Sequence, residues 1–121
     1  MQIVPALSFG GNCREAIHMY ARGFQGSISC LITYGEANDP AYLPLLKENQ
    51  KDFIYHSELI LGEQRIILAD HVDIEFQTCY SNFLTVMFDT KEEVQRAYEV
   101  MKEGSQTIYP MEATPYSSCR V

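Results

Sequence analysis

The sequence predicts a single α+β domain made of two related modules. A β-branched and aromatic run at residues 3–9 is followed by a glycine turn and an amphipathic helix. A diverged copy of this strand–cap–helix unit begins near residue 82. Further strand-like runs, bounded by turn residues, occupy much of the remaining chain. At 121 residues the chain is long enough for one domain with one core.

The first module is predicted to begin with a strand at residues 3–9 and a helix from residue 13. Pro5 has no N–H, so this strand is expected either at an edge of the sheet or with one ladder position unpaired. Asn12 is a good N-cap, and Glu15 follows it at the spacing of a capping box. Apolar side chains at positions 13, 16, 17, 20, 21 and 24 fall on one helical face.

Three more strands are predicted in this module, over residues 27–34, 53–61 and 65–70. Residues 36–52 are mostly polar and form the longest irregular stretch, so they are a candidate lid. Within this stretch, Asp39 and Pro40 are typical of the cap and first position of a short helix. Residues 71–81 show no clean period and are interpreted as a linker.

The second module, residues 82–121, repeats the pattern with one strand fewer. A strand is predicted at residues 82–89, then a helix capped by Thr90 and Glu93 and ended by Gly104. Two strands follow, at residues 107–111 and 117–121. The first module, about residues 1–70, has three strands after its helix, so the second module lacks its last strand. A missing strand would leave a sheet edge open.

Charge and composition exclude several classes of function. The net charge is −7, and nine Lys and Arg residues are scattered among sixteen Asp and Glu residues. Nucleic-acid binding needs clustered basic residues, so it is not expected. No apolar run approaches the roughly 18 residues of a membrane span. The N-terminus has no basic region followed by a hydrophobic stretch, which favours a cytoplasmic protein that has no membrane partner.

The cysteines and serines give no indication of a nucleophile. No two cysteines are spaced as CxxC, and we interpret all four as reduced thiols in or near the core. Three serines lack the strand-to-helix elbow of a nucleophilic serine. The cysteines are Cys13, Cys30, Cys79 and Cys119, and the serines are Ser8, Ser57 and Ser117.

Several segments together resemble the PhnB-like branch of the glyoxalase/bleomycin-resistance/dioxygenase group, within the vicinal oxygen chelate superfamily. The resemblance implies paired βαβββ modules that form an incomplete barrel around a cleft. It also implies a small-molecule ligand and a homodimer. The segments are VPALSF at 4–9, GNCREA at 11–16, TYGEA at 33–37, HSEL at 56–59, and Ala69-Asp70.

The sequence departs from the metal-dependent members of this group. At the positions that match their ligands it has Pro5, Leu68 and Phe83, and the fourth ligand would lie on the strand that this chain lacks. We therefore expect a protein of unknown specificity that binds a small molecule without a metal or other cofactor. The alternatives are a metal-dependent lyase, isomerase or dioxygenase, and a non-catalytic module that dimerises through its open edge.

The candidate ligand-binding residues are His56, Glu58, Tyr34 and Asp70, and no catalytic residue is assigned. His56 and Glu58 lie two residues apart on a predicted strand, so their side chains leave the same face. Such a pair can orient a ligand, act as a general base with its partner, or supply two metal ligands. It can equally line a polar cleft wall or an exposed sheet face without doing chemistry.

Overall fold

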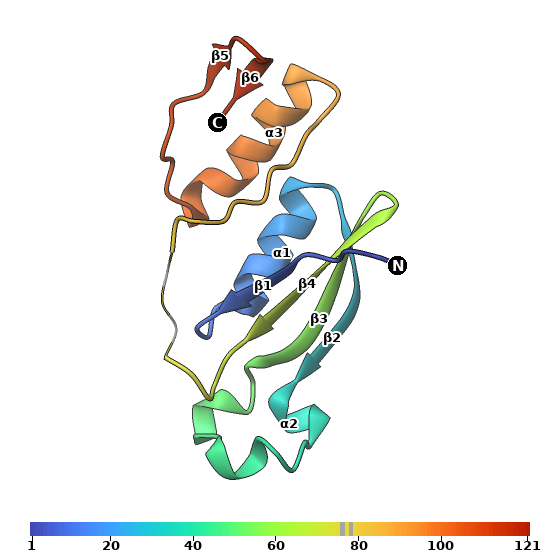
Figure 1. Cartoon of the computed structure of the whole chain (residues 1–121), viewed down its shortest axis with the longest axis vertical. Coiled ribbons are helices and arrows are strands. Elements are labelled where there is room, and N and C mark those ends of the chain that lie inside the picture. Colours follow the sequence, from blue (N-terminus) through green and yellow to red (C-terminus); the bar gives the residue numbers. More distant parts are fainter. Residues whose placement is uncertain (76, 78) are drawn as a thin grey trace.

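The first module forms a four-stranded sheet with one long helix. The computed structural model describes residues 1–75, 77 and 79–121 of the chain (Figure 1). The strands follow the order β1-β4-β3-β2, with β1 parallel to β4 and the other pairs antiparallel. The elements are β1 (Ala6–Phe9), α1 (Cys13–Gly23), β2 (Ser27–Thr33), α2 (Tyr34–Ala37), β3 (Ile54–Leu61) and β4 (Gln64–Asp70), with 3₁₀ helices at Leu43–Leu45 and Glu48–Gln50.

The second module contains one helix and a small hairpin. In its described residues, α3 (Lys91–Met101) leads into a 3₁₀ turn at Lys102–Gly104, and β5 (Glu112–Thr114) pairs antiparallel with β6 (Ser117–Arg120). The molecule is thus α+β, with one four-stranded and one two-stranded sheet and no closed barrel among the described residues. This confirms the predicted fold class.

The core lies between α1 and one face of the four-stranded sheet. Side chains alternate across a strand, so every second residue of β4, and of β3 from Ser57 onward, points toward the helix. The apolar stripe of α1 covers these residues, as the helical period predicts. Pro5 lies directly before β1 at the edge of the sheet, which confirms its predicted edge position. The buried cluster is Cys13, Ile17, Ile54, Leu59, Ile66 and Leu68.

Two predicted strands are wrong. Residues 82–89 form no strand, and the strand expected at 107–111 is also absent, while the hairpin lies at residues 112–120. A strand needs a neighbour to satisfy its backbone N–H and C=O groups, and no described segment pairs with residues 82–89. As a result Phe83 and Met87 are 75% and 89% exposed.

The two modules meet where α3 packs on α1. A guanidinium nitrogen of Arg96, Nη2, donates to the carbonyl oxygen of Gly23 over 2.7 Å, and Nη1 donates to the carbonyl of Arg22 over 3.3 Å. These carbonyls end α1 and have no partner within the helix, so Arg96 caps α1 from the other module. Gly23 also allows close packing, because a Cβ there would lie 2.7 Å from the sulfur of Met101.

No helix among the described residues has the length and hydropathy needed to cross a membrane.

Candidate functional site

The sheet face opposite α1 carries the candidate site, and we call it the open face. Strand pairing defines it, because Cys30 pairs with Glu58, Ile32 with His56, and Ser8 with Ala69. These residues alternate with the core residues described above. The side chains of the open face are Ala6, Ser8, Cys30, Ile32, His56, Glu58, Ile60, Arg65, Ile67 and Ala69.

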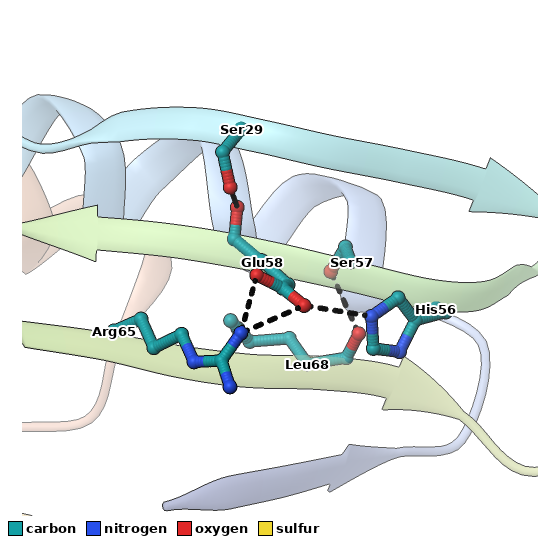
Figure 2. A network of polar contacts seen from close by, with 6 residues as sticks. All are labelled: Ser29, His56, Ser57, Glu58, Arg65 and Leu68. Atoms are coloured by element: carbon teal, nitrogen blue, oxygen red, sulfur yellow. Dashed lines mark hydrogen bonds and ion pairs between the residues drawn. The ribbon is translucent and has the colours of Figure 1, made fainter. Parts of the chain in front are cut away.

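Three charged or polar side chains meet at the centre of this face (Figure 2). His56 Nε2 lies 3.2 Å from Glu58 Oε1, and Arg65 Nη1 lies 3.2 Å from Glu58 Oε2. His56 and Glu58 come from β3, while Arg65 reaches across diagonally from β4. The structure therefore brings His56 and Glu58 together on one face, as their spacing predicts.

The pKa of the Glu58 carboxyl is lowered from its usual value of 4.5. The hydrogen bond to His56 is the largest cause; partial burial opposes it, and the bond and charge of Arg65 add to it. Near neutral pH the group is therefore an ionised carboxylate that accepts hydrogen bonds. This suits Glu58 to orienting a polar ligand group rather than to donating a proton.

Asp70 lies on the core side of the sheet instead, and Tyr34 is buried at the end of the sheet, in α2. Asp70 is 1% exposed, and its carboxylate accepts from the backbone N–H groups of Gly11, Cys13 and Ile54 over 2.8, 3.1 and 2.8 Å. The Tyr34 hydroxyl donates to the Asp70 carbonyl over 2.8 Å. In this structure Asp70 and Tyr34 hold segments of the chain together. That either of them also contacts a ligand stays a prediction.

Three tyrosines anchor the candidate-lid stretch to the end of the sheet. The rings of Tyr34, Tyr42 and Tyr55 meet edge to face, with centroids 5.3 to 6.0 Å apart. The hydroxyl of Tyr55 also donates to Asp39 Oδ2 over 2.9 Å. The three rings therefore pack against one another at this end of the sheet.

Sequence reasoning missed a second polar group beside the open face. Ser8 Oγ lies 2.8 Å from His71 Nε2, and His71 Nδ1 lies 3.9 Å from Asp73 Oδ1. The backbone N–H of His71 donates to the carbonyl of Phe9, which fixes His71 beside the end of β1. Ser8 and His71 are 63 residues apart, so no local spacing could have indicated this contact.

The open face continues into a hollow, and another hollow lies in the second module. A hollow of about 330 Å³ lies at the Ile60 and Arg65 end and is also lined by Gln2, Ile3, Val4, Glu63 and Gln64. Another, of about 420 Å³, is lined by Tyr80, Phe83, Gln106, Thr107, Ile108 and Tyr109. Neither of these two hollows includes His56, and we call the centre of the open face, around His56 and Glu58, the shelf.

The residues present do not fit a glyoxalase-type metal centre. Among the described residues, no three His, Cys, Asp or Glu side chains come close enough to hold a metal ion. Leu68 is fully buried in the core, while Phe83 is exposed on the second module. Neither these two side chains nor Pro5 offers a donor atom.

Searches of family models and of curated proteins gave no match to this chain. Solved structures do match it. The protein PA1353 from Pseudomonas aeruginosa superposes with a TM-score of 0.81 at 27% identity, over 98% of this chain and 85% of that one. The PhnB protein from Bacillus cereus gives 0.74 at 21% identity, over 98% and 87%.

A third structure, TioX from Micromonospora sp. ML1, has a TM-score of 0.50 at 14% identity, over 97% of this chain and 81% of TioX. At such identities these likenesses concern the arrangement of the backbone. The superpositions on PA1353 and on the PhnB protein cover nearly the whole chain. The chain therefore has the fold of PhnB-like proteins.

Proposed function

We propose that this PhnB-like protein binds a small molecule on its open face without a glyoxalase-type metal. The observation that carries the proposal is the ionised Glu58 carboxylate held between His56 and Arg65 on a half-buried, mainly apolar sheet face. Small-molecule sites typically combine an apolar floor with a few fixed polar groups. Here Ile32 and Ile67 supply the floor on either side of β3.

The surface area supports a second copy of the chain as the other wall of this site. A folded monomer of 13.8 kDa exposes about 6,600 Å² by the size scaling of globular proteins. This chain exposes 8681 Å², which is about 2,000 Å² more. An obligate homodimer buries roughly 2,000 to 5,000 Å² over both chains. The excess area is therefore enough for a stable dimer.

The exposed apolar side chains are concentrated in the segment that would supply this wall. The linker and second module expose Ile74, Tyr80, Phe83, Leu84, Met87, Ile108, Tyr109, Tyr116 and Val121. Monomeric proteins rarely expose so many neighbouring apolar groups, which mark interaction sites. In the proposed homodimer, the second module of one copy covers the open face of the other and turns the shelf into a cleft.

The ligand proposal is tested by a thermal-shift screen of metal-free protein against panels of metabolites and antibiotics. We expect at least one chemical class to raise the melting temperature of the wild type. That shift should be lost in His56→Ala and Glu58→Gln but kept in Ser118→Ala, an exposed strand position on β6. A screen without hits, or shifts unchanged in both site variants, contradicts the proposal.

Metal analysis of protein purified without chelators separates the proposal from the metal-dependent alternative. We expect less than stoichiometric divalent metal. One metal ion per chain would instead favour a metal-dependent lyase, isomerase or dioxygenase that uses His56 and Glu58 as two of its ligands.

A further inference from the structure

At the edge of the open face, Ser8 Oγ lies at hydrogen-bond distance from His71 Nε2, and the Asp73 carboxylate lies 3.9 Å from Nδ1 of the same ring. We propose that Ser8, His71 and Asp73 form a nucleophilic site that accepts the acyl group of a small carboxylic ester. This inference adds a reaction to the proposed binding function. It rests on that function in one respect, because the substrate is taken to lie on the same open face. Triads are recognised by geometry and by the role of each group rather than by order in the sequence.

The two nitrogens of His71 face the groups that a triad requires. Nε2 lies 2.8 Å from Ser8 Oγ, which is hydrogen-bond distance. Nδ1, on the other side of the ring, faces the Asp73 carboxylate at 3.9 Å. In the tautomer with its proton on Nδ1, His71 accepts the Ser8 hydroxyl proton on Nε2, while the Asp73 carboxylate lies beyond hydrogen-bond distance of Nδ1. Catalytic hydrogen bonds of this kind are often longer before substrate binds.

The fold does not depend on this arrangement. The backbone N–H of His71 already bonds to the Phe9 carbonyl, and this bond continues the pairing of β1 with β4. The side chains of His71 and Asp73 are each 37% exposed, and Ser8 is exposed as well. The three side chains are therefore accessible to a substrate. Because hydrogen bonds between exposed groups contribute little to stability, the fold does not need the contact between Ser8 and His71.

The substrate has a place to lie between Ser8 and the Glu58 group. Ser8 pairs with Ala69 of β4, whose side chain is a single methyl group and so occupies little space beside Ser8. Because Ser57 pairs with Leu68, the antiparallel register places His56 on the far side of Ala69. Two strand spacings separate Ser8 from His56, which is about 10 Å. An ester of a few carbon atoms spans this distance.

The reaction proceeds in two balanced steps. Ser8 Oγ attacks the ester carbonyl carbon while its proton passes to His71 Nε2, and the carbon–oxygen bond to the leaving alcohol breaks as that proton is delivered to the alcohol oxygen. Water then attacks the acyl-serine, with His71 again accepting the proton and returning it to Ser8 Oγ. The products are an alcohol and a carboxylic acid, and Asp73 acts as a positioning residue.

The test uses diisopropyl fluorophosphate, which phosphorylates activated serines with loss of fluoride. We expect one adduct per chain, located on Ser8 by peptide mass spectrometry. Labelling should be abolished in Ser8→Ala and unchanged in Ser118→Ala. In His71→Gln, which keeps a hydrogen-bonding side chain without its basicity, the labelling rate should fall about a hundredfold.

The role of Asp73 is tested by rescue. Asp73→Asn should slow the labelling of Ser8 about tenfold or more, and Asp73→Glu should restore part of the rate. Far-UV circular dichroism checks that each variant is folded. No adduct on Ser8, or a labelling rate unchanged in His71→Gln, overturns the inference. Either result leaves the binding proposal standing, because that proposal is decided by the ligand shifts of the His56 and Glu58 variants.

Discussion

At the residue scale, Asp70 joins three segments that are far apart in the sequence. Its carboxylate accepts backbone hydrogen bonds from the glycine turn, the start of α1 and the start of β3. Each buried N–H that loses its acceptor costs about 1 to 3 kcal/mol. We expect Asp70→Ala to lower the free energy of unfolding by about 3 to 5 kcal/mol, as measured by urea denaturation.

Two further variants make the Asp70 measurement specific. Asp70→Asn keeps one carbonyl oxygen as an acceptor, so its loss of stability should be about 1 to 3 kcal/mol. Asp52→Ala, at an exposed position, should change the free energy of unfolding by less than about 0.5 kcal/mol. Equal losses in Asp70→Ala and Asp52→Ala would show that Asp70 does not hold these segments together.

Glu58 should titrate below 4.5, the usual pKa of its carboxyl group. The shift is a depression, so the interactions of the Glu58 carboxylate with His56 and Arg65 are present above the folded pKa and are lost as the pH falls through it. Because His56 is the largest cause, His56→Ala should raise the pKa of Glu58 more than Arg65→Gln does. Carbon-detected NMR titration of the Glu58 carboxyl measures its pKa in the wild type and in both variants. A larger rise in Arg65→Gln than in His56→Ala would contradict His56 as the main cause of the shift.

The four cysteines should differ sharply in reactivity. Burial, followed by the nearby charge of Asp70, raises the pKa of the Cys13 thiol to about 12. Cys79 is exposed, and its hydrogen bond with Ser81 lowers the pKa of its thiol. Thiolate is the nucleophile, so iodoacetamide at pH 8 should alkylate Cys79 first and Cys13 only after unfolding. Mass spectrometry of timed samples checks the order, and early labelling of Cys13 would contradict it.

At the scale of elements, the two long helices begin in different ways. Thr90 and Glu93 form the predicted capping box of α3, with Thr90 Oγ1 accepting from the Glu93 N–H and Glu93 Oε2 from the Thr90 N–H. Asn12 makes no side-chain capping bond at α1. Asp70 accepts from the N–H groups of Gly11 and Cys13 there instead, from a site more than 50 residues away.

This difference predicts unequal effects of equivalent substitutions. Thr90→Ala should lower the free energy of unfolding by about 1 kcal/mol, since it removes a working cap. Asn12→Ala should cost less than about 0.5 kcal/mol, because its side chain caps nothing. Thermal or urea unfolding of both variants measures the difference, and a larger loss in Asn12→Ala would show that the Asn12 side chain does cap α1.

Element prediction succeeded where the pattern was local. The amphipathic period and the glycine at position 23 define α1, and alternation defines β3 and β4. The mainly apolar run at residues 82–89 also predicted a strand, which the structure lacks. A helix satisfies its own backbone groups, whereas a strand depends on a neighbouring segment that its own sequence does not specify.

At the scale of the whole molecule, the proposed homodimer gives a direct prediction. Analytical ultracentrifugation of the wild type at micromolar concentration should show a mass twice that of the 13.8 kDa chain. Charges introduced by Phe83→Glu and Met87→Glu should yield monomers, since both side chains are exposed in the single chain and buried in the proposed dimer. Lys91→Glu, an exposed position at the start of α3, serves as the control. A monomeric wild type contradicts the proposal.

Local patterns of residues were enough to predict the α+β class, the two long helices, the edge position next to Pro5 and the shared face of His56 and Glu58. Each of these follows from spacing or chemistry within a few residues. The pairing of the strands was needed to show that Tyr34 and Asp70 are buried, that Asp70 replaces Asn12 as a cap, and that Ser8 meets His71. These contacts join segments more than 30 residues apart, so they depend on how the strands pair and not on any local pattern.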